Sequence, residues 1–277
     1  MKTISTIKEM RNVRRRVMGS VGFVPTMGSL HEGHLSLVKK ARVENEVVVA
    51  SIFVNPTQFG PGEDYALYPR DPGRDADLLR RERTDMLFMP SAEEIYPHGF
   101  DSWVRVGYVT QRLEGASRPG HFEGVTTVVA KLFNIVKPTR AYFGQKDAQQ
   151  AIVIKKMVAE LNMDLDVAVL PTVREEDGLA MSSRNIYLNP EERRSAPILF
   201  KALTLARERF MNGERNADHL RQAMVSFING NSLANIDYVS IADPYNLEEL
   251  SMIDCPALAS LAVRIGKTRL IDNIRLE

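Results

Sequence analysis

The chain has 277 residues, of which 44% are hydrophobic and 26% charged, and its formal net charge is +1. This composition is ordinary for a globular protein with a full core, and a charge so close to zero, with no apolar run long enough to span a bilayer, argues against a nucleic-acid-binding or membrane protein. The single cysteine, Cys255, excludes an internal disulfide framework, and with no signal-peptide core near Met1 it predicts a cytoplasmic protein.

The first 173 residues predict strands that alternate with helices. Ile7, Met10, Val13 and Val17 recur at helical spacing, so the arginines among them predict an amphipathic helix; a transit peptide is the alternative. Further helices are expected over 35–43, 75–83, 124–136 and 148–161, and strands over 21–24, 47–54, 86–89, 141–143 and 166–170. Alternation of this kind predicts a parallel sheet with helices on both faces.

Beyond residue 173, helices come first and strands follow. Asn189 and Pro190 form a strong start signal for a helix predicted to run to Met211. A second helix is expected over 217–228, and strands over 236–241, 258–265 and 268–271 with a hairpin turn at Gly266-Lys267. We therefore predict an α/β domain over residues 1–173 and a smaller α+β domain over 174–277.

The segment PTMGSLHEGH, residues 25–34, lies between a predicted strand and a predicted helix. Such a turn directs backbone N–H groups and the positive end of a helix dipole at a bound anion. His31 and His34 share one helical face, which suits a nucleotide phosphate. A zinc site is the alternative, but the protease signature needs histidines four residues apart and these are three apart.

Gly144-Gln145-Lys146-Asp147 forms a second strand–turn–helix junction. Lys146 offers a point charge to phosphate, and Asp147 can accept hydrogen bonds from ribose hydroxyls. The two turns are expected to flank one crevice, because ligands of open parallel sheets bind beyond the carboxyl ends of the strands. The alternative is that Asp147 only caps the helix and Lys146 is solvated.

Four other polar segments are candidates for the same crevice. Met181-Ser182-Ser183-Arg184 suits terminal phosphates, and the amides of Asn55, Gln58 and Gln150 suit a small polar substrate. The Gly-bearing loop Arg118–Gly124 is expected to be a lid or a wall of the cleft. Each of these segments also reads as an ordinary polar loop when it is taken alone.

Taken in order, the segments PTMGSLHEGH, FVNPTQF, YPRD, RPGHFEGV, YFGQKDAQQ and LAMSSRN closely resemble the pantoate–β-alanine ligase family. This family belongs with the nucleotidylyltransferases and class I aminoacyl-tRNA synthetases that carry a His-x-Gly-His signature, and MSSR stands where these relatives carry KMSKS. The resemblance implies a Rossmann-like N-terminal domain, a smaller C-terminal lid hinged near residues 171–178, and a homodimer.

The implied reaction has two steps and uses Mg²⁺ and ATP. The carboxylate of pantoate attacks the α-phosphorus of ATP to give pantoyl adenylate and pyrophosphate. The amine of β-alanine then attacks the acyl carbon, giving pantothenate and AMP. One alternative is an adenylyltransferase that keeps the AMP on its product, and another is a nucleotide-sensing module without turnover.

The resemblance also implies roles for individual residues. His34 would be the catalytic proton donor, assisted by His31, Lys146 and Arg184. Pantoate would lie on Gln58 and Gln150, and β-alanine on Gln58 and Asn55. Asp75 or Asp77 is a possible Mg²⁺ ligand, although the phosphates themselves are the alternative. The residues expected to contact ATP are Met27, Gly28, Ser29, Leu30, His31, Glu32, Gly33, His34, Gly144, Gln145 (where many relatives have Glu), Lys146, Asp147, Val173, Met181, Ser182, Ser183 and Arg184.

Overall fold

Six parallel strands form the sheet of the N-terminal half in the computed structural model, which describes residues 1–277. Their order is β1-β4-β3-β2-β5-β6, and every neighbouring pair is parallel. The strands are β1 (Lys2–Ile4), β2 (Val21–Thr26), β3 (Val47–Ile52), β4 (Met86–Phe88), β5 (Arg140–Gly144) and β6 (Asp166–Leu170). The parallel sheet is confirmed, and the edge strand β1 was not predicted because its three residues are too few to show a pattern.

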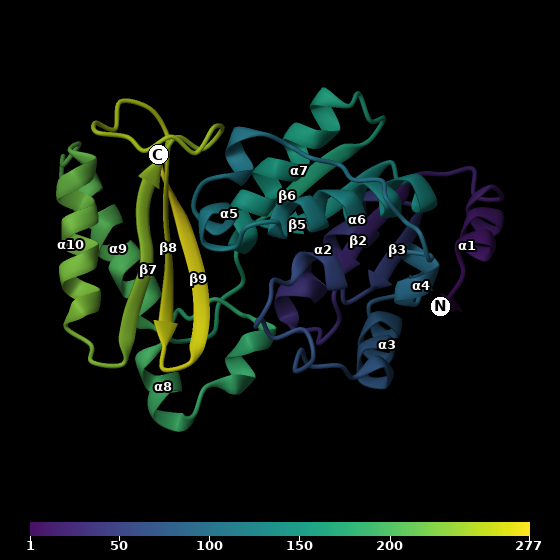
Figure 1. Cartoon of the computed structure of the whole chain (residues 1–277), viewed down its shortest axis with the longest axis horizontal. Coiled ribbons are helices and arrows are strands. Elements are labelled where there is room, and N and C mark those ends of the chain that lie inside the picture. Colours follow the sequence, from purple (N-terminus) through teal and green to yellow (C-terminus); the bar gives the residue numbers. More distant parts are fainter.

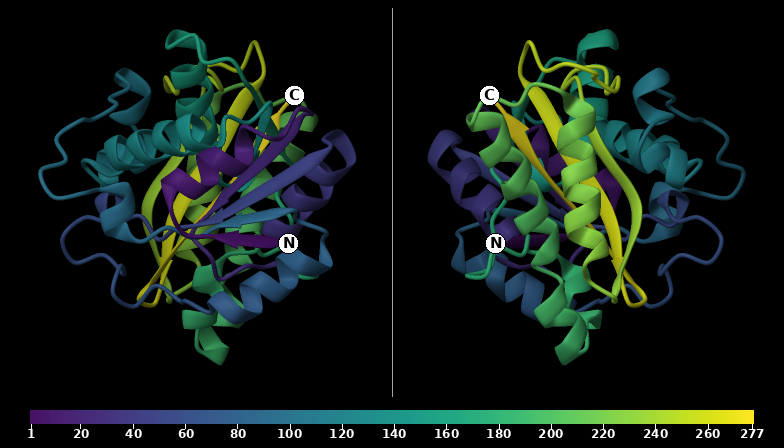
Figure 2. Two further views of the ribbon diagram at one scale, coloured as in Figure 1. Left: turned by 90° about the vertical axis from the view of Figure 1, so that its right-hand side faces the viewer. Right: turned by 90° about the vertical axis from the view of Figure 1, so that its left-hand side faces the viewer.

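Helices cover both faces of this sheet (Figure 2). Phe23 and Phe143 pack with α6 and α7 on one face, whereas Val24 and Val48 pack with α2 and α3 on the other. This alternation explains why the strands are nearly continuous apolar runs. The helices are α1 (Ile7–Arg14), α2 (Glu32–Glu44), α3 (Pro72–Arg81), α4 (Ala92–Ile95), α5 (Glu114–Ser117), α6 (His121–Val136) and α7 (Ala148–Glu160), and the 3₁₀ turns are η1 (Pro56–Gln58), η2 (Tyr108–Thr110) and η3 (Gln145–Asp147).

Three of these helices begin one turn earlier than the apolar pattern predicted. α2 begins at Glu32, α3 at Pro72 and α6 at His121, in each case three residues before the predicted start. The first turns of α2 and α3 are capped by side chains and lack the apolar periodicity of the core-facing turns, whereas α6 begins without a side-chain cap after Gly120. His31 caps α2 and Asp71 caps α3 through their side chains.

The C-terminal half packs two helices on a three-stranded antiparallel sheet of order β7-β8-β9. Figure 1 shows α9 and α10 on the outer side of this sheet and β9 as its strand nearest the N-terminal half. The elements are η4 (Ser183–Tyr187), α8 (Pro190–Ser195), α9 (Ile198–Met211), α10 (Ala217–Asn229), β7 (Ala234–Ala242), β8 (Ala257–Ile265) and β9 (Thr268–Leu276). None of the helices in the chain combines the length and apolar character needed to cross a membrane.

The single helix predicted from Pro190 to Met211 is wrong. The chain forms two helices instead, and Pro197 stands at the junction as the N-cap of α9. Proline has no N–H to donate, and its ring clashes with the carbonyl one turn earlier, so it ends α8 and starts α9. The predicted start at Asn189 and Pro190 is confirmed: Asn189 is the N-cap of α8 and forms a capping box with Glu192.

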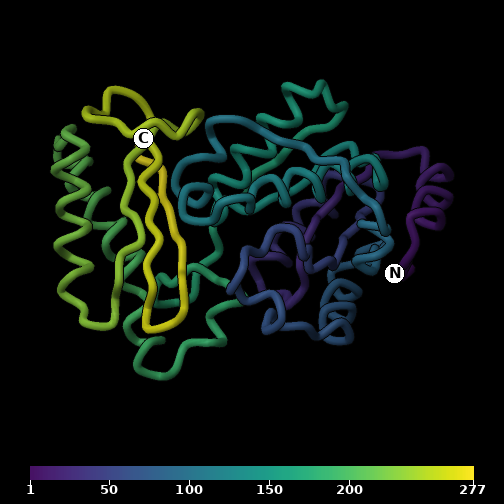
Figure 3. The backbone as a smooth tube through the Cα atoms, in the orientation of Figure 1, coloured from purple at the N-terminus to yellow at the C-terminus, as the bar shows by residue number.

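The backbone passes from the first half to the second through residues 171–189 (Figure 3). The C-terminal half has its own apolar core, which includes Leu199, Leu203, Met224 and Leu261 and contains only residues beyond 178. The domain boundary after residue 173 stays a prediction, and it is consistent with this separate core.

Candidate active site

The site is built where the chain order of the parallel sheet reverses. β2 lies next to β5, and from β2 the chain builds outward through β3 before it returns through β5 on the other side. The carboxyl ends of two such strands leave a crevice between their connecting turns. The structure thus brings the turn after β2 and the turn after β5 to one place, as the sequence predicted.

Asp75 holds the turn that follows β2. Its carboxylate is only 1% exposed and accepts hydrogen bonds from the N–H groups of Ser29, at 2.7 Å, and Leu30, at 2.8 Å. Gly28 and Ser29 both have positive φ angles, so these bonds stabilise a backbone that costs conformational energy. The carboxylate of Asp75 is therefore committed to the loop.

This arrangement revises the expectation that Asp75 or Asp77 binds Mg²⁺. Both oxygens of Asp75 already accept backbone hydrogen bonds, and Asp77 is exposed on α3 in an ion pair with Arg80. No group of three or more His, Cys, Asp or Glu side chains in the chain is arranged to hold a metal ion. The residues therefore do not fit a dedicated protein site for the cation.

The two histidines cap the helix that follows this turn. His31 is the N-cap of α2, and its Nδ1 accepts from the N–H of Gly33 at 3.1 Å. His34 accepts the N–H of His31 at its own Nδ1, at 3.4 Å, and the ring centroids are 4.1 Å apart. Because both Nδ1 atoms are acceptors, the proton of each neutral ring is on Nε2. A Cβ at Gly33 would lie 2.8 Å from Cε1 of His31, so this cap needs glycine there.

Both histidines are neutral at physiological pH. Burial lowers the pKa of His31 to about 4, with a further contribution from the charge of Lys146. Burial also lowers the pKa of His34 to about 3, helped by His31. The pair therefore offers two uncharged Nε2–H donors, and neither ring stores a proton as an imidazolium.

We expect the free energy of unfolding to decrease as the pH falls from about 6.5 towards 4. In this window an unfolded histidine, whose pKa is about 6.5, binds a proton that buried His31 and His34 refuse, so acid favours the unfolded chain by up to about 1.4 kcal/mol per pH unit for each ring. Urea unfolding across this range measures the slope. The variant His34→Asn should have a shallower slope than the wild type, and an equal slope would contradict the assignment.

Lys146 and Asp147 form the opposite side of the crevice. The Lys146 ammonium lies 3.4 Å from the carboxylate of Asp147 and close enough to lower the pKa of both histidines. Asp147 precedes α7 but makes no side-chain cap there, so the reading of this residue as a simple helix cap is not supported. In the first turn of α7, Gln149 and Gln150 both line the cavity, and the amide of Gln149 donates to the carbonyls of Val109 and Arg112.

Asn55 fixes the position of Gln58. Its amide, 1% exposed, donates to Oε1 of Gln58 at 3.2 Å and to the carbonyl of Gly124 at 3.1 Å. Its oxygen accepts from the hydroxyls of Thr57 and Tyr96, each at 2.9 Å. All its hydrogen-bonding capacity is used inside the protein, so Asn55 supports Gln58, and its expected contact with β-alanine stays a prediction.

The side chain of Gln58 contacts the turn that follows β2. Its Nε2 lies 2.8 Å from the sulfur of Met27. Gly124 packs directly under this segment, because a Cβ there would lie 2.4 Å from the carbonyl oxygen of Thr57. The close approach of α6 to η1 therefore sets where Gln58 stands.

The segment 181–184 packs against the turn after β2. Ser183 donates to the carbonyl of Ser29 at 3.0 Å, and the N–H of Met181 donates to the carbonyl of Val173 at 3.0 Å. The guanidinium of Arg184 is held by both oxygens of Asp64, at 2.9 and 2.7 Å. The serine and arginine predicted for phosphate thus lie beside the histidine-bearing loop.

Arg118 and His121 make the predicted loop a wall of the cleft. Arg118 binds both oxygens of Glu63, at 2.7 and 2.6 Å, and donates to Nε2 of His121 at 3.1 Å. Nδ1 of His121 donates to the carbonyl of Gln58 at 2.8 Å. Sequence reasoning missed Glu63 and Asp64, because nothing in an acidic pair within a polar loop shows which distant arginines it will hold.

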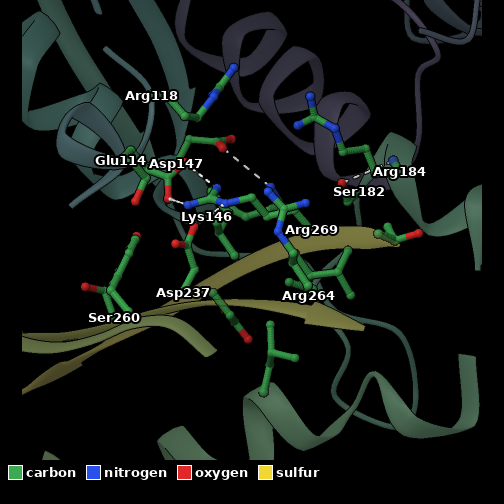
Figure 4. Close-up of a pocket in the computed structure, with 18 of the residues that line it drawn as sticks. Glu114, Arg118, Lys146, Asp147, Ser182, Arg184, Asp237, Ser260, Arg264 and Arg269 are labelled. Carbon is green, nitrogen blue, oxygen red and sulfur yellow. Dashed lines mark hydrogen bonds and ion pairs between the residues drawn. The ribbon is translucent and has the colours of Figure 1, made fainter. Parts of the chain in front are cut away.

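A cavity of about 810 Å³ lies between the two halves (Figure 4). Residues of both halves line it, and its charged groups are of both signs. The cations are Arg118, Lys146, Arg184, Arg264, Lys267 and Arg269, and the carboxylates are Glu63, Asp64, Glu114, Asp147, Glu192, Asp237 and Asp272. The histidine pair and Gln58 are not among its lining residues, and Met27 and Gly28 border a second cavity of about 200 Å³. A polyphosphate in this cleft would pair with these cations in competition with the carboxylates.

Comparison with known proteins places this geometry in a family. A profile of the family described as pantoate-beta-alanine ligase matches residues 2–275. The chain is 60% identical to the pantothenate synthetase of Roseiflexus castenholzii, over 100% of both chains, and 55% identical to that of Thermotoga neapolitana, over 99% of both.

Solved structures agree. The chain superposes on the pantothenate synthetase of Thermus thermophilus with a TM-score of 0.96, at 50% identity and 99% coverage of both chains. It superposes on a pantoate-beta-alanine ligase of Francisella tularensis with a TM-score of 0.81, at 37% identity, covering 99% of this chain and 97% of the other. That structure was solved in complex with beta-gamma ATP and beta-alanine.

Proposed function

The chain belongs to the pantoate–β-alanine ligase family, and we propose that its cleft joins pantoate to β-alanine through a pantoyl-adenylate intermediate at the expense of ATP. A carboxylate oxygen of pantoate bonds to the α-phosphorus while the bond to pyrophosphate breaks. The amine of β-alanine then bonds to the acyl carbon, AMP leaves, and the amine loses a proton. The family match over residues 2–275 carries this proposal, and it favours a ligase over the adenylyltransferase and binding-module alternatives.

We propose that the chain accelerates the first step by neutralising charge. Negative charge grows on the phosphate oxygens as the bond to pyrophosphate breaks, and the Nε2–H groups of His31 and His34 are free to donate to them. Lys146 supplies a cation close to the same rings. Arg184, which is paired with Asp64, is proposed to exchange that carboxylate for a phosphate and so to supply the second cation. The other expected ATP contacts, from Met27 to His34, Gly144 to Asp147, Val173 and Met181 to Arg184, belong to these same turns.

Pantoate is proposed to lie between the amides of Gln58 and Gln150. Neutral amides can hold a carboxylate and hydroxyls without an ion pair, so the carboxylate keeps its nucleophilicity. The bond from Asn55 and the contact with Met27 support Gln58 in this position. β-Alanine is then expected beside Gln58, with Asn55 as a positioning residue behind it.

Mg²⁺, closure and assembly complete the proposal. Mg²⁺ is expected to arrive with ATP and to be held by the phosphates, because the carboxylate of Asp75 is committed to backbone N–H groups. Residues 174–277 are proposed to close as a lid hinged near 171–178, carrying Ser182 and Arg184. We further propose a cytoplasmic homodimer, as the family resemblance implies.

The direct test is product analysis with purified protein. Incubation with ATP, Mg²⁺, pantoate and β-alanine should give pantothenate and AMP in equal amounts. Without β-alanine, pantoate should still promote exchange of labelled pyrophosphate into ATP. A stable adenylylated product with no amide, or ATP binding with no exchange, would reject the ligase.

We expect Gln150→Ala to act mainly on pantoate. The loss of one hydrogen bond to a charged group costs about 1.5–3 kcal/mol, which corresponds to a rise of about 10- to 100-fold in KM for pantoate. The KM for ATP should change little. Steady-state kinetics measures both constants, and the exposed amide variant Gln111→Ala is the matched control. An unchanged pantoate constant would remove Gln150 from the pantoate site.

A further inference from the structure

One buried amide of the C-terminal half reaches the phosphate-binding turn of the N-terminal half. Asn273 lies on β9, the strand nearest that half in Figure 1, and only 4% of it is exposed. Arg269 and Asn273 are four residues apart on the strand, so both project from the same face, and both line the cavity. Arg269 pairs there with Glu114 of α5, at 2.7 and 2.8 Å.

The amide of Asn273 is saturated by the turn η3. Its Nδ2 donates to the carbonyls of Gln145 and Lys146, both at 2.9 Å. Its Oδ1 accepts from Nε2 of Gln145, also at 2.9 Å. Both hydrogens of one side chain therefore hold two successive peptide groups of the turn.

No side-chain cap within the turn itself holds its peptide groups. Neither Gly144, at the start of η3, nor Asp147, at the start of α7, makes a side-chain cap. A short turn with no cap is held only by its neighbours, and the direction of a side chain follows the orientation of its own peptide groups. Asn273 holds the turn in a different way from such a cap, because from a strand of the other half it donates to two carbonyls of the turn.

Asn273 is itself firmly held. Asp272, 3% exposed, accepts the N–H of Asn273 at 2.8 Å and binds the Arg174 guanidinium at 2.6 and 2.9 Å. Arg174 also stacks on the ring of Phe200, with its Cζ 3.9 Å from the centroid. Because Asn273 is held in this way, the position of β9 determines where the turn η3 lies.

We propose that Asn273 is a positioning residue for adenylation: it orients the Gln145–Lys146 peptide groups so that the Lys146 ammonium meets the phosphates of ATP. This inference rests on the proposed function. Gln145 contributes to this arrangement, because the hydrogen bond that it donates to Oδ1 orients the Asn273 amide with its Nδ2 towards the two carbonyls.

The variant Asn273→Asp tests this with little change in shape. Aspartate still accepts from Gln145, but it donates to neither carbonyl and sets a negative charge against both. We expect kcat/KM for ATP in pyrophosphate exchange to fall at least about tenfold, with KM for pantoate within about twofold of the wild type. Asn231→Asp, an amide of the same half that bonds Ser195, is the control and should behave as the wild type.

A double-mutant cycle separates positioning from a merely structural effect. If Asn273 acts through Lys146, then Asn273→Asp should cost little in a Lys146→Met background, whereas a general loss of structure would cost the same in both. An undiminished loss in that background, or wild-type kinetics of Asn273→Asp, would overturn the proposal.

A further variant covers the case in which Asn273→Asp does not fold. Gln145→Ala removes the hydrogen bond to Oδ1 of Asn273 from the other side and should lower kcat/KM for ATP in the same direction, and wild-type kinetics would again overturn the inference. Failure of the proposed function gives a different result from failure of this inference. The wild type would then show no pantoate-dependent exchange, whereas calorimetry could still show weaker ATP binding by Asn273→Asp.

Discussion

Replacement of His34 by asparagine is expected to lower the rate of adenylation at least about 100-fold. Asparagine keeps an acceptor near the position of Nδ1 for the N–H of His31, so the cap of α2 is preserved. It has no group at the position of Nε2, and loss of one donor aimed at developing charge costs roughly 10²–10³ in rate. Pantoate-dependent pyrophosphate exchange measures the effect without the second step.

Two further variants make this result specific. His34→Gln extends an amide towards the position of Nε2 and should recover part of the rate that asparagine loses. His98→Asn changes an exposed histidine far from the two turns and should leave exchange unchanged. Full exchange by a folded His34→Asn protein would show that its Nε2–H group does not act on the phosphates.

Replacement of Lys146 by methionine is expected to cost about 10²–10³ in adenylation, the range for loss of a charge stabiliser. Methionine keeps much of the length and apolar volume of the lysine stem, so the change removes a charge with little loss of packing. The backbone bonds from Asn273 do not depend on the side chain of Lys146, and the turn should stay formed. The same exchange assay, with ATP binding measured by calorimetry, separates an effect on rate from an effect on affinity.

Lys155→Met provides the control for this experiment. Lys155 lies on α7 but is exposed, so its loss should leave both exchange and ATP binding unchanged. If Lys146→Met lowers only the affinity for ATP and not the rate at saturation, then the lysine binds ATP equally in the ground state and the transition state, and the proposed catalytic role is wrong.

Because His31 and His34 are neutral, their expected role differs from that of the cations Lys146 and Arg184. Two adjacent imidazolium rings beside Lys146 would repel one another, and burial lowers the pKa of both rings far below neutrality. Fixed positive charge is therefore left to Lys146 and Arg184, and the histidines provide hydrogen bonds that do not change between pH 5 and 8. If the cleft binds phosphate as proposed, these donors do not titrate in the physiological range.

Arg184 and Arg118 of the cleft are both paired with carboxylates. Each guanidinium is held through two hydrogen bonds, Arg184 by Asp64 and Arg118 by Glu63, so neither is left unpaired before substrates bind. An anionic ligand must compete with these carboxylates, which favours groups of higher charge such as phosphate. The acids Glu63 and Asp64 lie just before the YPRD segment, and no motif marked these two residues themselves.

Much of the fold follows from local patterns, and the errors have local causes. The β-branched run around Val49 predicted a strand buried on both faces, because only a strand covered by helices on both sides can be apolar at every position. Helix starts such as Glu32 and Pro72 were missed, because periodicity detects only the turns that touch the core. The break at Pro197 was missed although a proline inside a helical pattern predicts it.

The side chains proposed to act on ATP belong to short motifs, and those motifs can be recognised because each occupies one strand–turn–helix junction. His31, His34 and Lys146 belong to this class. The functions of Asp75, Asn55 and Asn273 are decided only in three dimensions. A buried carboxylate or amide takes its role from the donors and acceptors within about 3 Å of it, and here those partners come from distant parts of the chain, which only the packing of the two halves brings together.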